Sequence, residues 1–308
     1  MLWGNGHDAA LLVAGFDHLA FRQILAKFTP QYIRYTPHSD DGVIRLRYSN
    51  RSRRRLMRPE DCLALVFLWC RTKVSSSVCE TWLKFGIHVL DSVMVNMTES
   101  RIVLPDEATM PQFIDAIRQR HNLLDNLWAV VDGLKLYLSE CGDCLIQNAY
   151  YNEWTSDCYI DNLFIFTPDG CIAFRILNAP GSWHDAEIAK AGGLYDMFNA
   201  IFEKFGAKVI ADSAFPLKAG YEQQLTNSRQ PAKWVMRALQ RGFPRLKARF
   251  PYEERGHRCV VMRMISALHN ARTRMVGINK IRNVYMPELE REAEGLFNLP
   301  QWIEAVSD

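Results

Sequence analysis

The sequence changes character at residue 127, and this change limits the folds that the chain can adopt. Before it, apolar residues recur at the spacing of amphipathic helices, in segments 16–28, 59–70 and 110–120. Beyond it, the apolar runs are short and typical of strands, at 127–138, 159–166, 171–177 and 207–211. Helical patterns follow the third and fourth runs, at 185–205 and 230–250. This order predicts an α/β domain over residues 125–308, preceded by a helical region over residues 1–124.

The helical region has the pattern of a helix-turn-helix unit at about residues 59–102. Pro59 suits the first turn of a helix, and we expect further helices at 78–84 and about 88–102, separated by a tight turn at Gly86. Seven arginines and no acid lie between residues 45 and 58, and three of them are adjacent: Arg53, Arg54 and Arg55. The combination favours DNA binding, although a helical subdomain that binds no nucleic acid can have the same helices.

Charge is distributed unevenly along the chain. The 308 residues include 37 Lys and Arg against 34 Asp and Glu, for a net charge of +3. Residues 225–283 carry 14 of these cations and two acids, so this segment is +12 and the remainder is −9. Either a solvated cationic surface or a phosphate-binding surface would give this pattern, and the second arginine cluster favours the latter. The candidate phosphate contacts are Arg237, Arg241, Arg245 and Lys247.

Composition narrows the class of protein and its compartment. A hydrophobic content of 48% is that of a globular protein, which excludes a disordered or collagen-like chain. The longest strongly apolar run, residues 63–69, is far shorter than the roughly 20 residues that cross a bilayer, so we expect no membrane partner. Eight cysteines are too few for a disulfide scaffold of this length. We therefore expect an intracellular protein, and the basic run at 51–55 favours nuclear import.

Two aspartates have positions that indicate chemistry. Asp132 lies in the apolar run at 127–138, and Asp212 directly follows the run at 207–211. A carboxylate on an apolar strand is costly to bury unless it is paired or bound to a metal. Two of them at neighbouring strand ends can hold Mg²⁺ or Mn²⁺, which prefer oxygen ligands, and such ions can promote phosphodiester cleavage. The alternative is that both aspartates accept hydrogen bonds from loops at the strand ends.

Four short motifs resemble a known family when they are taken in order. They are Trp-Ala-Val-Val-Asp-Gly at 128–133, Tyr-Tyr-Asn-Glu-Trp-Thr at 150–155, Pro-Gly-Ser-Trp-His-Asp at 180–185 and Ile-Ala-Asp-Ser-Ala-Phe-Pro at 210–216. This ordered set is similar to the DDE superfamily endonuclease domain of PIF/Harbinger-type transposases. Residues 268–272 and 277–281 resemble the closing segment of that domain, and the N-terminal half resembles the trihelical region that precedes it.

The resemblance implies an RNase H-like nuclease domain that acts on DNA with Mg²⁺ or Mn²⁺. It assigns Asp132 and Asp212 as the first two catalytic, metal-binding acids. It places His184 and Asp185 in or beside the site, although a pair that braces a loop after Pro180-Gly181 fits these two residues equally well. An accessory DNA-binding protein or self-association would accompany such a domain.

The expected third acid is missing from the sequence. The family typically has a glutamate just before a tryptophan, and here Lys233 precedes Trp234. No Asp or Glu occurs between residues 226 and 252. A charged lysine cannot ligate Mg²⁺, and replacing a carboxylate by a cation is expected to cost several kcal/mol of metal binding. The two open interpretations are an endonuclease with impaired activity and a catalytically silent DNA- or protein-binding module.

Overall fold

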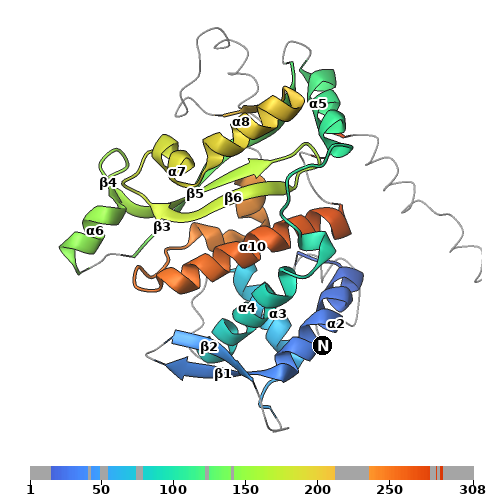
Figure 1. Cartoon of the computed structure of the whole chain (residues 1–308). Coiled ribbons are helices and arrows are strands. Elements are labelled where there is room, and N and C mark those ends of the chain that lie inside the picture. The colour runs from blue at the N-terminus through green and yellow to red at the C-terminus, as the bar shows by residue number, and fades with distance from the viewer. Residues whose placement is uncertain are drawn as a thin grey trace, which may run out of the picture.

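A five-stranded sheet with helices on both faces dominates the structure, a computed structural model (Figure 1). It describes residues 15–40, 43–48, 55–73, 79–121, 125–139, 142–211, 236–277, 282, 285 and 286. The strands of the sheet are β3 (Leu127–Tyr137), β4 (Tyr151–Asn152), β5 (Asp157–Phe166), β6 (Ile172–Pro180) and β7 (Lys208–Ile210). The longer helices are α2 (His18–Arg34), α3 (Pro59–Arg71), α4 (Glu80–Met94), α5 (Thr109–Arg120), α8 (Leu194–Phe205) and α10 (Arg255–Val276). The shorter elements are the hairpin β1 (Tyr35–Asp40) and β2 (Val43–Tyr48), the helices α6 (Cys144–Tyr150) and α7 (Asp185–Ala191), and the 3₁₀ turns η1 (Thr98–Ser100) and η2 (Pro244–Lys247).

The central strand of the sheet is β3. It pairs antiparallel with β5 on one side and parallel with β7 on the other, where Val130 lies opposite Ile210. On its far side β5 pairs antiparallel with β6, and its first residues also pair with β4. The turn between β5 and β6 was predicted from its Pro-Asp-Gly sequence and is confirmed, with the Gly170 N–H donating to the Thr167 carbonyl at 2.8 Å.

Alternate residues of β3 face two different sets of helices. Val130 and Leu134 belong to an apolar cluster that also contains residues of α2, α3, α4 and α10. Val131 belongs to a second cluster with residues of α5, α7 and α8. Since successive side chains of a strand point to opposite faces, β3 has one face toward α10 and the other toward α7 and α8. The same alternation decides which face of the sheet each polar side chain of β3 is on.

Helix α10 lies between the sheet and the N-terminal helices, as Figure 1 shows. One continuous cluster of buried side chains extends from Phe16 on the N-terminal side to Phe164 on the sheet and Leu268 on α10. The helical region before residue 124 therefore shares its core with the strands beyond it. None of the helices in the described part of the chain, including the 22-residue α10, is long and apolar enough to span a membrane.

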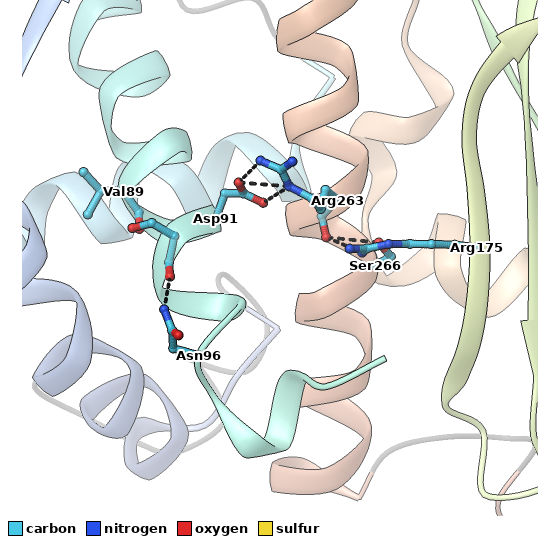
Figure 2. A network of polar contacts seen from close by, with 7 residues as sticks. Val89, Asp91, Asn96, Arg175, Arg263 and Ser266 are labelled. Atoms are coloured by element: carbon cyan, nitrogen blue, oxygen red, sulfur yellow. Dashed lines mark hydrogen bonds and ion pairs between the residues drawn. The ribbon is translucent and has the colours of Figure 1, made fainter. Parts of the chain in front are cut away.

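A polar network joins three layers of the fold (Figure 2). Asp91 on α4 accepts hydrogen bonds from the guanidinium of Arg263 on α10, with Nε 2.9 Å from Oδ1. Arg175 on β6 donates to the Arg263 carbonyl at 2.8 Å and also to Ser266 Oγ. Burial lowers the pKa of the Arg175 guanidinium to about 10. The network links the N-terminal helices to the sheet through the middle of α10.

The predicted tight turn at Gly86 is wrong, because residues 80–94 form the single helix α4. A Cβ at Gly86 would lie 2.8 Å from both Cys62 Sγ and Val66 Cγ2 on α3. The glycine thus allows two helices to approach closely and does not break one. Helix α4 is also buried along most of its length, packed against α2, α3 and α10. The predicted turn of a helix-turn-helix unit is therefore absent at this place.

Other boundaries also differ from the sequence-based expectation. Helix α2 continues past Pro30 to Arg34, and part of the arginine-rich segment forms strand β2 of a hairpin. The single helix predicted over residues 185–205 is divided into α7 and α8 at Gly193, whose positive φ of 70° favours glycine. Helix α6 was not predicted. The strands β3, β5, β6 and β7 occupy the four predicted runs within a few residues.

Candidate active site

Asp132 lies in the middle of the central strand. Because Val130 and Leu134 face α10, Asp132 lies on that same face of β3, and it pairs across the sheet with Phe164. Its carboxylate is only partly buried, and Oδ1 accepts a hydrogen bond from the Gly133 N–H at 3.0 Å. An accessible carboxylate in the centre of an apolar strand agrees with the expectation of a functional group.

The second predicted acid, Asp212, lies outside the described residues, as does Lys233. The described part of β7 ends two residues before Asp212, at Ile210, which pairs with Val130. Asp132 follows Val130 by the same two positions, so both acids are two residues beyond a matched pair of parallel strands. The distance between their carboxylates stays a prediction.

A second group of polar residues lies on the opposite face of β3, around Gly133. A Cβ at Gly133 would lie 3.6 Å from Asp185 Oδ1, at the start of α7, and 3.7 Å from Asp161 Oδ1 on β5. Lys135 pairs with Asp161 across the strands and donates from Nζ to the Tyr159 hydroxyl at 3.0 Å. The predicted His184-Asp185 motif is therefore beside this group, and the negative charge of Asp132 also acts on Asp161, where it helps to raise the pKa.

Asp161 is the most perturbed acid of this group. It is 2% exposed, and Oδ1 has no hydrogen-bond partner among the described residues. Burial, followed by the negative charge of Asp185, raises the pKa of Asp161 to about 7, while Lys135 acts in the opposite direction. Asp161 was not predicted as a site residue. The signal was present, since Asp161 interrupts an apolar strand just as Asp132 does.

His184 caps the short helix α7. It is the N-cap residue and is exposed, and its N–H donates to Glu187 Oε2 at 3.1 Å, a contact that secures the first turn. Glu187 and Asp185 also place negative charge at the helix N-terminus, which is favourable. Asp185 is half-buried and faces Gly133. The motif thus braces the start of a helix and presents one carboxylate to the sheet.

The predicted phosphate contacts differ in their environments. Arg237, Arg241 and Lys247 are exposed. Arg245 is instead engaged within the protein, because its guanidinium lies 4.7 Å from the Trp69 ring centroid and donates to the Lys73 carbonyl at 3.2 Å. Burial lowers the pKa of Arg245.

Several other cations of the basic segment also hold the fold together. Arg258 is fully buried and donates to the carbonyls of Pro251 and Tyr252. Arg249 forms a two-pronged ion pair with Asp157, at 2.7 and 3.0 Å. Much of the positive charge counted in the sequence therefore serves internal contacts, which reduces the surface available to a polyanion.

The N-terminal arginine cluster is described only in part. Arg53 and Arg54 lie outside the described residues. Arg55 donates to the carbonyls of Ile33 and Tyr35, each at 2.7 Å, and its guanidinium lies 4.6 Å from the centroid of the Tyr32 ring. Arg55 thus satisfies carbonyls at the C-terminus of α2, where no intrahelical donors are left.

The donor chemistry of Asp132 fits a hard divalent cation, because carboxylate oxygens are the ligands that Mg²⁺ and Mn²⁺ prefer. A single acid does not make a site. Among the residues that the structure describes, no group of three or more His, Cys, Asp and Glu side chains is arranged to hold a metal ion. A complete set of ligands would have to include residues beyond Ala211, where the described part of this region ends.

Comparison with known proteins identifies the class of the sheet-containing region. Residues 131–270 match the family model of the DDE superfamily endonucleases. The match begins one residue before Asp132 and ends within α10, so it covers nearly all of the five-stranded sheet. No curated protein and no solved structure matches the chain. This match agrees with the resemblance of the ordered motifs to a DDE endonuclease domain.

Proposed function

We propose that the chain is a PIF/Harbinger-type, transposase-derived protein whose RNase H-like domain descends from a metal-dependent DNA endonuclease. The observation that carries this proposal is the DDE endonuclease match over residues 131–270, with Asp132 at the centre of the matched sheet. Strand β3, which carries Asp132, pairs parallel with β7, which ends two residues before Asp212 in the sequence, and this pairing supports the proposal.

Asp132 and Asp212 are the residues that would hold the divalent metal. When bound, Mg²⁺ or Mn²⁺ supplies positive charge that stabilises the phosphodiester oxygens during hydrolysis. Asp132 is suited to this role because its carboxylate is partly accessible and is oriented by the Gly133 N–H. Asp185 lies beside Gly133 at the start of α7 and is assigned a supporting role.

We infer that Lys233 impairs this activity. The substitution removes one carboxylate ligand and adds a cation that opposes the metal, which together cost several kcal/mol, or roughly a hundredfold or more in affinity. A lysine in this place would instead pair with Asp132 and Asp212.

A plasmid-nicking assay with Mn²⁺ tests this proposal when it is combined with a direct measurement of Mn²⁺ binding by electron paramagnetic resonance. The unmutated chain is expected to bind Mn²⁺ weakly and to nick slowly, and Lys233→Glu is expected to improve both. Adding Asp132→Asn to Lys233→Glu should abolish the gain. Asp115→Asn on the exposed side of α5 is the matched control and should change neither measurement.

Two results would overturn parts of the proposal separately. Robust nicking by the unmutated chain, equal to that of Lys233→Glu, would show that Lys233 does not impair the site. Mn²⁺ binding that is insensitive to Asp132→Asn would remove Asp132 from the metal site.

The exposed cations Arg237, Arg241 and Lys247 are the proposed contacts with DNA phosphates in the described region. Arg53 and Arg54 are proposed to extend this contact from the N-terminal side and to serve in nuclear import. An accessory DNA-binding protein or a second copy of the chain would supply the target recognition that these sequence-independent contacts lack.

The second candidate function is a silent binding module that retains the nuclease fold without cleavage. The position of Lys233 favours it, because a lysine paired with two aspartates stabilises the site without metal. The same nicking assay separates the two candidates. A chain that binds DNA but shows no cleavage at any Mn²⁺ concentration, even as Lys233→Glu, would fit the silent module.

A further inference from the structure

Helix α6 and strand β4 lie together at one end of the sheet (Figure 1). Trp154, in the turn after β4, is 94% exposed, and Leu145 on α6 is 82% exposed. Ile146, Tyr151 and Trp183 are also exposed, and we refer to these five apolar residues as the α6 surface. Two hydrogen bonds hold its segments together, from Ser182 Oγ to the Ala149 carbonyl and from Asn152 Nδ2 to the Gly181 carbonyl, both 2.9 Å.

Helix α6 is only weakly stabilised by packing against the rest of the chain. It is seven residues long, and none of its residues is buried. Its first turn is held by the Asp143 carboxylate, which accepts from the Leu145 N–H at 2.8 Å, and Tyr150 packs against the core at its end. A helix this short is marginal without packing, and large exposed apolar groups in one place mark an interaction surface.

The acidic residues near the α6 surface indicate what kind of partner could bind there. Between Lys135 and Arg175 the sequence has six acids and not one Lys, Arg or His. Asp143 and Glu153 flank the exposed apolar side chains, and the guanidinium of Arg249, beside the start of β5, is occupied by Asp157. Of these acids, Asp161 is buried and Asp157 is paired with Arg249, whereas Asp143 and Glu153 are exposed and attract cationic groups.

We propose that the α6 surface is a docking site for a cationic, amphipathic segment of a partner protein. The apolar side of the segment covers Leu145 and Trp154, and its Lys and Arg side chains face Asp143 and Glu153. The surface lies at the β4 end of the sheet and uses none of the residues assigned to DNA cleavage. This inference therefore stands whether or not the chain cuts DNA.

Fluorescence anisotropy with a labelled peptide tests the proposal on the full chain. The probe is an amphipathic helical peptide of about 18 residues with Leu on one face and Lys on the other, compared with a version in which Glu replaces every Lys. The Lys peptide is expected to bind, and the Leu145→Ser/Trp154→Ser double variant should weaken this binding about tenfold or more. The matched control is Leu19→Ser/Ile33→Ser, which changes two exposed apolar residues of α2 and should leave binding intact.

Several outcomes would overturn the proposal. These are no binding of the Lys peptide, equal binding by the Leu145→Ser/Trp154→Ser variant, and equal binding of the Glu peptide. Sedimentation velocity covers self-association, since a dimer that dissociates on Leu145→Ser/Trp154→Ser would assign the surface to a second copy of the chain. Binding of a labelled DNA duplex that is lost in the same variant would assign it to nucleic acid. Because the substituted side chains are exposed, the variants are expected to fold, and circular dichroism checks this.

Discussion

Asp91 on α4 and Arg263 on α10 form an ion pair that spans 172 positions of the sequence, with Nε 2.9 Å from Oδ1. The Asp91 side chain is 7% exposed and that of Arg263 is 42% exposed. The Asp91 carboxylate raises the pKa of the Arg263 guanidinium through the hydrogen bond between them. The pair fixes the N-terminal helices to the helix that covers the sheet (Figure 2).

Removing Arg263 and removing Asp91 are expected to lower the free energy of unfolding by different amounts. Arg263→Ala leaves a buried carboxylate without its main donor and should lower the free energy of unfolding by about 2–3 kcal/mol. Asp91→Ala leaves a cation that can reach water and should cost less, about 1 kcal/mol. Urea denaturation followed by circular dichroism measures both, with Arg22→Ala on the exposed face of α2 as control. A larger loss for Asp91→Ala than for Arg263→Ala would contradict this account.

Gly86 is expected to tolerate no side chain. Gly86→Ala places a methyl group 2.8 Å from Cys62 Sγ and Val66 Cγ2, and we expect a loss of about 1–3 kcal/mol although alanine is the better helix former. Gly256 in the first turn of α10 is the matched control, because a Cβ there meets nothing within 4 Å. Gly256→Ala should therefore be neutral or stabilising by up to about 1 kcal/mol. Thermal unfolding of the two variants separates the contact between α3 and α4 from helix propensity.

Some arginines of the basic segment are expected to stabilise the fold, and others are expected to bind DNA. Arg245→Ala loses the stacking on Trp69 and should lower the melting temperature. Arg237→Ala/Arg241→Ala should leave the melting temperature unchanged and weaken duplex DNA binding, with the slope of log Kd against log salt falling by roughly 0.9 for each lost phosphate contact. Anisotropy titrations at several salt concentrations check the second class. An unchanged salt dependence in the double variant would exclude these arginines from the DNA contact.

Asp161 is expected to make the protein less stable as the pH rises from about 4 to about 7. Its pKa is raised from the ordinary aspartate value of 3.8 to about 7 in the folded chain, so the folded state keeps a proton that the unfolded state has released. Stability from this group is therefore highest below about pH 4 and levels off above about pH 7. Asp161→Asn cannot ionise, so its stability relative to the unmutated chain should improve across this window, by about 3–4 kcal/mol.

Urea denaturation at about pH 4.5 and pH 7.5 measures this gain. The exposed Asp115→Asn serves as control, and its difference from the unmutated chain should be the same at both pH values. If the folded state does not retain the proton on Asp161, the difference in stability between Asp161→Asn and the unmutated chain will also be the same at both pH values. That result would contradict the prediction.

The strands could be predicted because each is encoded locally. The apolar run at β3 and the Thr167–Gly170 turn between β5 and β6 need no distant partner to be recognised. The split of the predicted helix at Gly193 and the continuity of α4 through Gly86 could not be predicted in this way. A glycine can end a helix or let two helices meet, and only the position of α3 decides which one applies at Gly86.

The sequence by itself indicated the class of the domain and singled out Asp132 as a candidate site residue. The ordered motifs between residues 128 and 216 resemble a DDE endonuclease domain, and residues 131–270 match the model of that superfamily. The tertiary structure alone decided which charges are available. It buried Arg258, stacked Arg245 on Trp69 and raised the pKa of Asp161, because burial and neighbouring charges depend on residues far apart in the chain. It also left Leu145 and Trp154 exposed, since the helix and turn that carry them pack so little against the rest of the chain.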